Sequence, residues 1–286
     1  MTVRKGFHFV AFYSMEEEIK SGGARKSYML PASILVAALI VGGALVYTAG
    51  KGSTQSPVTD ASSTAPQASD ALVNVAPVST NDHINGDPGA AVKVIEFSDL
   101  ECPFCKEFHQ TLRELSTDYP NKFAWVFREY PIPQLHPKAP HEAQAAECAA
   151  KLGGNDKYWE YIDTIFQITP SNNGLDPAEL PKVAQQIGLN ADDFNTCLSS
   201  TYGQDIIQAD ETDGTNAGAI GTPYTIIEDA NGLPQATISL LNGLNTQYGA
   251  NPPLFVISKD QKMFSVGGAV PYPVMKQIFN TIFPTQ

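Results

Sequence analysis

The stretch AVKVIEFSDLECPFCKEFH, residues 91–109, contains the patterns that best indicate the fold of the chain. Its first part, AVKVIEF (91–97), is a near-continuous apolar run of strand length, typical of a central strand buried on both faces. From Cys102 onward the apolar residues fall at helical spacing, and Pro103 suits the first turn of a helix. A second apolar run, KFAWVFREY (122–130), follows this helix. Strand, helix and strand in this order predict a parallel pair with a right-handed crossover.

Two cysteines stand three apart at the start of this predicted helix, in the motif Cys102-Pro103-Phe104-Cys105. The unpaired backbone N–H groups and the helix dipole would stabilise a thiolate at Cys102. Cys105, one turn further in, is close enough to form a disulfide with Cys102 or to resolve a mixed disulfide. The motif therefore favours thiol–disulfide exchange. A zinc half-site and a purely structural disulfide are the alternatives, although zinc usually needs four ligands and the other cysteines stand alone.

The remainder of the chain predicts a helical block followed by two strands and a helix. The expected helices are 142–152, 156–168, 181–188, 191–200 and a segment ending near Asn216. The expected strands are 224–228 and 263–268, and 274–283 is an amphipathic helix. Within 230–260, the runs ATISLL and LFVIS are expected to be extra strands or part of an insertion. The order is β-α-β, a helical block, then β-β-α, an α/β fold.

The segments EFSDLECPFCKEFH (96–109) and GTP (221–223), with the helical block between them, resemble the DsbA-like branch of the thioredoxin-fold family. The resemblance runs from about Asp82 to Phe283. It implies a thioredoxin fold with a helical insertion, a nucleophilic Cys102 and a resolving Cys105. It also implies a cis peptide bond between Thr222 and Pro223, facing the motif, although from the residues alone Pro223 could be an ordinary turn proline.

Glu96 lies within the predicted buried strand, where an acid is costly unless it is paired or used. The resemblance implies that it accepts the proton of Cys105, and burial would raise its pKa for that task. The alternative is a strand-end side chain that reaches solvent.

Cys148 and Cys197 each lie on a predicted helix among apolar neighbours. Outside the cytoplasm they are expected to form a structural disulfide across the helical block, and two buried free thiols are the alternative. The aromatic group at 158–166 is expected to lie mostly in the core. His83, His136 and His141 show no ligand spacing and are expected at the surface, so no metal site is predicted.

The N-terminal part predicts a membrane anchor. YMLPASILVAALIVGGALVY (28–47) holds 20 residues without a charge, and basic residues are concentrated before it. We expect a cytoplasmic tail at 1–27, a transmembrane signal anchor at 28–49, a flexible linker at 50–81 and a thioredoxin-like domain at 82–286 with a helical insertion at about 138–216. A cleaved signal peptide and a start at Met15 are the alternatives. The catalytic domain would then lie outside the cytoplasm.

These features together indicate a protein disulfide oxidoreductase without a bound cofactor. We expect it to donate the Cys102–Cys105 disulfide to reduced, unfolded secreted proteins and to be reoxidised by a membrane quinone-linked thiol oxidase. Phe104 brings no positive charge to the motif and Asp99 and Glu101 bring negative charge, which favours a mild oxidant. A reductase or isomerase role and a non-enzymatic metal-delivery module are the alternatives.

The net charge of −12 makes nucleic acid an unsuitable partner, because an acidic protein repels the phosphate backbone.

Overall fold

The computed structural model describes residues 68–284. The expected tail at 1–27, the expected anchor at 28–49 and most of the expected linker lie outside these described residues. Within residues 68–284, no helix is both long enough and apolar enough to cross a membrane.

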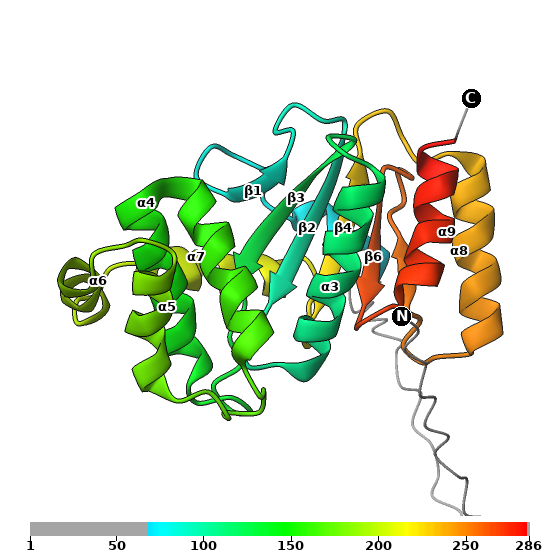
Figure 1. The fold of residues 1–286 in the computed structure, drawn as a ribbon. Helices are drawn as coiled ribbons and strands as arrows, with labels where there is room; N and C mark the ends of the chain where they lie inside the picture. Colours follow the sequence, from blue (N-terminus) through cyan, green and yellow to red (C-terminus); the bar gives the residue numbers. More distant parts are fainter. Residues whose placement is uncertain (1–67, 285–286) are drawn as a thin grey trace, which may run out of the picture. The chain divides into compact units, whose positions relative to one another are not determined.

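A six-stranded sheet forms the centre of the described part (Figure 1), in the order β1-β3-β2-β4-β6-β5. Its strands are β1 His83–Gly86, β2 Val92–Ser98, β3 Phe123–Glu129, β4 Tyr224–Asp229, β5 Phe255–Ile257 and β6 Met263–Gly267. β2 pairs with β3 in parallel, and the other four pairings are antiparallel. The mixed α/β thioredoxin-like fold predicted from the sequence is thereby confirmed.

The predicted helices are all present, and α2, α8 and two 3-10 turns are additions. They are α2 Ala68–Ala71, the 3-10 turn η1 Leu72–Asn74, α3 Pro103–Asp118, α4 Ala139–Ile168, the 3-10 turn η2 Pro177–Glu179, α5 Leu180–Gln186, α6 Ala191–Leu198, α7 Gln204–Asn216, α8 Gln235–Tyr248 and α9 Tyr272–Ile282. The two helices expected at 142–152 and 156–168 are parts of α4. Gly154, at φ 77°, breaks the helix between them because glycine adopts a positive φ at little cost.

The sheet buries both of its faces, which explains the continuous apolar character of β2. Val94 and Trp125 lie in the larger core with the apolar residues of α3 and α9. Ile95, Phe97 and Val126 lie in a second cluster on the opposite face. Figure 1 shows α3 in front of the central strands, α9 and α8 side by side near β6, and α4–α6 beyond the β1–β3 side of the sheet. The alternation of faces along β2 decides which side chains lie next to α3.

Two expectations were wrong, and one that the sequence left open is decided. The linker boundary at 81 is too late, because Leu72 and Val75 are buried in the second cluster and the Ala76 N–H donates to Asp213 Oδ1 at 2.6 Å. Of the two runs expected to be extra strands or part of an insertion, 236–241 is helical, as part of α8, and LFVIS contains the short strand β5.

The second error concerns two histidines that were expected at the surface. His136 is only 7% exposed and its Nδ1 lies 2.9 Å from Asp99 Oδ2. His83 stacks on Tyr158 with ring centroids 3.5 Å apart, and its Nε2 lies 3.0 Å from Glu147 Oε1. Sequence spacing identifies metal ligands but does not show that a lone histidine has a buried carboxylate as partner.

Candidate active site

Cys102 lies at the N-terminal end of α3, where the chain passes from the loop after β2 into the helix. It has extended backbone angles (φ −77°, ψ 123°) and is followed by Pro103 in the first turn. Its side chain is 5% exposed, and its Sγ lies 3.5 Å from the Thr222 carbonyl oxygen. The hydrogen bond from the Cys105 thiol, helped by the backbone N–H groups of Cys105 and Phe104, lowers the pKa of Cys102 to about 6. Cys102 is therefore mostly a thiolate at neutral pH.

Cys105 has the opposite character. It is fully buried, and burial raises the pKa of its thiol well above the ordinary value, as does the adjacent Cys102 sulfur. The Asp99 backbone N–H points at its Sγ from 3.4 Å. Both motif cysteines are free thiols in the structure. The reduced motif thus pairs one ionised, slightly exposed sulfur with one protonated, enclosed sulfur.

Glu96 lies behind Cys105 on the same face of the sheet. It is fully buried, and burial raises its pKa to about 7 even though two side chains hydrogen-bond to it. Ser98 Oγ donates to Oε1 at 2.8 Å, and Trp125 Nε1 donates to Oε2 at 2.9 Å. The alternative of a side chain that reaches solvent does not hold. A carboxyl that titrates near neutrality can take up and release a proton under physiological conditions.

Thr222 and Pro223 meet the motif from the far end of the chain. Their peptide bond is cis, and the loop that contains it leads directly into β4. The Thr222 carbonyl is the group that contacts the Cys102 sulfur. The structure therefore brings Glu96, Cys102, Cys105, Thr222 and Pro223 together at the end of β2 and the start of β4.

The negative charges expected to oppose a Cys102 thiolate are engaged elsewhere. Asp99 is fully buried and accepts hydrogen bonds from the Glu101 N–H and the Ile132 N–H, both at 2.8 Å. Glu101 accepts from two backbone N–H groups, those of Asn173 at 2.7 Å and of Leu175 at 3.2 Å. These amide dipoles offset much of the carboxylate charge near the motif.

An apolar surface adjoins the nucleophile. Phe104, between the two cysteines, is 58% exposed, and Ile220, before the cis proline, is 88% exposed. A cavity of about 440 Å³ opens beside Phe104 and Thr222, and a second of about 330 Å³ begins at Thr222 and Pro223. Tyr248 and Leu254, which lie in the segment between β4 and β6, line the first cavity. Residues 230–260 therefore contribute to the surroundings of the site, which the sequence did not indicate.

Cys148 and Cys197 lie away from the motif. They form a disulfide between α4 and α6 with their Cα atoms 5.8 Å apart. Within the described residues, no group of three or more His, Cys, Asp or Glu side chains could hold a metal ion.

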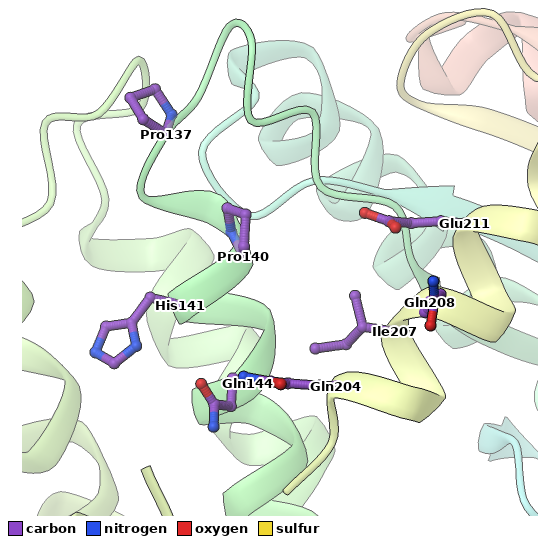
Figure 2. A pocket seen from close by; sticks show the side chains of 8 residues that line it. All are labelled: Pro137, Pro140, His141, Gln144, Gln204, Ile207, Gln208 and Glu211. Atoms are coloured by element: carbon purple, nitrogen blue, oxygen red, sulfur yellow. The ribbon is translucent and has the colours of Figure 1, made fainter. Parts of the chain in front are cut away.

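A further cavity of about 500 Å³ lies between the start of α4 and α7, as Figure 2 shows. Its lining consists of Pro137, Pro140, His141, Gln144, Gln204, Ile207, Gln208 and Glu211. It contains no nucleophile and none of the residues gathered at the motif. The candidate active site is therefore the surface around Cys102 and not this cavity.

Comparison with known proteins agrees with this fold. The family model described as "Thioredoxin" matches residues 78–239. The crystal structure of Pseudomonas aeruginosa DsbA2 is similar with a TM-score of 0.53 at 21% identity, covering 72% of this chain and 97% of that protein. A thioredoxin-like oxidoreductase from Silicibacter pomeroyi gives a TM-score of 0.52 at 20% identity, covering 76% of this chain and 98% of that one. At such identities the likeness shows a common fold.

The similar curated proteins are Na(+)/H(+) antiporters. NhaA 3 of Salinispora tropica is 34% identical over 154 residues, which are 54% of this chain and 22% of the antiporter. NhaA 1 of Salinispora arenicola is 35% identical over 155 residues, with the same two coverages. The chain thus spans about a fifth of the length of these curated relatives. The family match over more than half of the sequence shows that the chain belongs to the thioredoxin family, with the DsbA-like form of its fold.

Proposed function

We propose that the protein is a thiol–disulfide oxidoreductase that donates the Cys102–Cys105 disulfide to reduced, unfolded proteins outside the cytoplasm. The observation that carries this proposal is the contrast between the two thiols. The pKa of Cys102 is lowered to about 6, whereas burial raises that of Cys105 well above its usual value. A stabilised thiolate favours the reduced form of the pair, and a pair that favours its reduced form is a disulfide donor.

The reaction begins when a substrate thiolate attacks Cys102 Sγ of the oxidised pair. The Cys102–Cys105 bond breaks, Cys105 leaves as a thiolate, and Glu96 supplies the proton that neutralises it. A second substrate thiolate then attacks the substrate sulfur of the mixed disulfide. Cys102 leaves as the stabilised thiolate, so the substrate has lost two electrons and the motif has gained them.

Substrate binding is assigned to the backbone beside the cis proline. An extended peptide can pair with the Thr222–Pro223 segment as a short added strand, which presents a substrate sulfur to Cys102. The exposed side chains of Phe104 and Ile220 and the adjoining cavities would contact apolar residues, which unfolded proteins expose.

The setting of the reaction is also a proposal. The anchor at 28–49, with its cytoplasmic tail at 1–27, would hold the domain at the outer face of the membrane. A quinone-linked thiol oxidase in the same membrane would then reoxidise the motif. We do not extend sodium–proton exchange to this chain, because the similar stretch is 22% of the antiporter.

The deciding experiment is the reduction potential of the full chain in detergent, equilibrated in glutathione buffers. We expect a value well above the roughly −270 mV of thioredoxin, in the range of about −200 to −120 mV that disulfide donors and isomerases occupy. A Cys102→Ser variant is the control, since it removes the couple and leaves the Cys148–Cys197 bond. A thioredoxin-like potential would contradict the donor role and favour a reductase that receives electrons through the membrane.

A further inference from the structure

Ser98 lies behind the motif. Neither the sequence pattern nor the proposed reaction gives this residue a role. It is the last residue of β2, two residues after Glu96, so both side chains lie on the face of the sheet that α3 covers. α3 carries Cys105, the first buried residue of that helix. Ser98, Glu96 and Cys105 are each 0% exposed. Three groups that can carry a proton are therefore enclosed together, away from bulk water.

The contacts place Ser98 between the other two groups. Its Oγ lies 2.8 Å from Glu96 Oε1, and the N–H of the next residue, Asp99, lies 3.4 Å from Cys105 Sγ. Burial raises the pKa of the Cys105 thiol, and the Ser98 side chain acts in the opposite direction, as a hydroxyl that faces the sulfur does. A serine hydroxyl has one proton to donate and two lone pairs that accept. It cannot donate to Glu96 and to Cys105 at the same time. When it donates to one of them it can accept a hydrogen bond from the other, so the three groups can be linked in two directions.

Those two directions correspond to the two protonation states that the reaction needs. When Cys105 is a thiol and Cys102 is held in the mixed disulfide, the Cys105 S–H is free to point to Ser98, and the Ser98 hydroxyl points to an ionised Glu96. When Cys105 is a thiolate, the protonated Glu96 points to Ser98 and the hydroxyl points to the sulfur. Moving each proton along one bond converts the first state into the second.

We propose that the Ser98 hydroxyl carries the proton between the Cys105 thiol and the Glu96 carboxylate. In the closing step, Cys105 S–H gives its proton to Ser98 Oγ while Ser98 gives its own to Glu96 Oε1. The resulting thiolate attacks Cys102 Sγ in the mixed disulfide and expels the partner thiolate. The reverse transfer protonates Cys105 when it leaves. This inference rests on the proposed function, because it assigns a role in the same exchange.

Other groups around Cys105 and Glu96 do not offer a parallel path. The Asp99 N–H at 3.4 Å from Cys105 Sγ can stabilise a thiolate, but an amide N–H accepts no proton. The second oxygen of Glu96 receives the Trp125 indole N–H, which is a donor only. Among the described residues, Ser98 is thus the side chain that we place between the thiol and the acid. The pKa of Glu96, raised by burial to about 7, suits it to receive this proton near neutrality.

The chain provides a matched control in Thr225. This residue pairs with Glu96 across β4, is 0% exposed, and its hydroxyl has no hydrogen-bond partner. Thr225→Val removes a buried hydroxyl next to the same carboxylate without touching the Cys105–Ser98–Glu96 chain. Removing an unsatisfied hydroxyl is close to neutral for stability. Ser98→Ala and Thr225→Val therefore separate loss of the relay from loss of a buried hydroxyl in general.

The test follows the reaction of the reduced full chain, in detergent, with a stoichiometric aromatic disulfide such as dithiobis(nitrobenzoate). The first release of thionitrobenzoate reports attack by Cys102. The second reports closure by Cys105. We expect Ser98→Ala to leave the first phase unchanged and to slow the second by roughly 10²-fold near pH 6.5, the lower end of what positioned proton transfer contributes. Thr225→Val should match the wild type in both phases.

The pH profile distinguishes a relay from a structural role. With the relay, closure should rise with pH and level off above the pKa of Glu96, about 7. Without it, Cys105 must lose its proton to solvent, so closure in Ser98→Ala should keep rising at higher pH and approach the wild-type rate. The Glu96→Gln and Ser98→Ala variants should not be additive, since both remove the same path.

Two results would overturn the inference. One is a second phase in Ser98→Ala as fast as that of the wild type near pH 6.5. The other is a slowing that is equal at every pH or is shared by Thr225→Val. Absence of a second phase in the wild type would instead contradict the proposed exchange itself, and the relay with it.

Discussion

At the scale of single residues, the site depends on giving two identical side chains different acidities. Cys102 and Cys105 stand three residues apart, and only their positions in α3 differ. The first lies at the helix start, where backbone N–H groups are free to stabilise a negative sulfur. The second lies in the core, where burial disfavours a thiolate. The same helix thus provides both the nucleophile and a thiol that reacts only when a base takes its proton.

Replacing Phe104 should change the pKa of Cys102 and the reduction potential of the motif. It is 58% exposed and neutral, so its replacement is expected to leave the fold intact. In Phe104→His, a protonated imidazole next to Cys102 should lower the thiolate pKa further. A decrease of one unit corresponds to about 1.4 kcal/mol, or roughly 30 mV in the potential of a two-electron couple. Thiolate absorbance titration and glutathione equilibration measure the two quantities.

Phe104→Leu is the matched control, since it changes shape without adding charge. The electrostatic explanation would be wrong if both variants moved the potential equally.

The sequence predicted most of the candidate site but gave no role to Ser98. The motif, the buried acid and the proline loop were found because each has a recognisable spacing or neighbourhood. Ser98 was overlooked, although its position two residues after Glu96 in a strand already places both on one face. What the sequence could not reveal is that α3 brings Cys105 onto that face. Likewise, Asp99 and Glu101 looked like free charges because the backbone amides that bind them belong to distant loops.

At the scale of elements, the helices and central strands follow the apolar pattern, whereas the segment between β4 and β6 does not. Its run at 236–241 alternates enough to suggest a strand, yet it belongs to α8. Tertiary packing decides the outcome. Ile238, Leu241 and Leu244 are buried in the main core, and Asn245 forms hydrogen bonds with both the N–H and the C=O of Phe255 in β5. Contacts of this kind are invisible to local periodicity.

The helical block is held by an element-scale link, the Cys148–Cys197 disulfide. The two residues are 49 apart in sequence, and closing a loop of that length corresponds to about 4 kcal/mol in the chain-entropy model. We expect Cys148→Ala/Cys197→Ala to lower the Tm by about 10 °C, since a domain of this size loses roughly 2–4 °C per kcal/mol. Calorimetry of the full chain measures the change.

The same double variant should retain the reduction potential of the Cys102–Cys105 couple, because the disulfide lies between α4 and α6 and away from the motif. An altered potential would show that the two cysteine pairs are coupled.

At the scale of the whole described part, buried acids are the unusual feature. Burial raises the pKa of Glu96 to about 7, of Asp210 to about 8 and of Glu142 to about 9, and raises that of Glu129 well above its ordinary value. One of the four belongs to the candidate relay. The other three lie on β3, α4 and α7. Their raised pKa values therefore arise from the packing between the sheet and the helical block.

These acids predict that the fold is more stable in mild acid than in mild alkali. A carboxyl with a raised folded-state pKa keeps its proton longer in the folded chain than in the unfolded one. Its contribution is complete below the ordinary value near 4 and is lost as pH rises through about 7 to 9. His109 and Cys102 act in the opposite sense. Burial lowers the pKa of His109, and the hydrogen bond from Cys105 lowers that of Cys102 to about 6, so both contributions are lost as pH falls. Because the four carboxyls with raised pKa values outnumber these two groups, the free energy of unfolding should fall by on the order of 3 kcal/mol between pH 5 and pH 8.

Urea denaturation at constant ionic strength tests this, with Glu129→Gln to identify the source. Glu129 is 1% exposed, and its Oε1 accepts the Tyr158 hydroxyl at 2.9 Å, a bond that a glutamine oxygen can keep. The variant should therefore lose less stability than the wild type between pH 5 and pH 8. Glu114→Gln, an exposed position on α3, removes the same charge and should leave the slope unchanged. A stability that rises with pH, or equal slopes in Glu129→Gln and the wild type, would mean that the buried acids do not control the pH response.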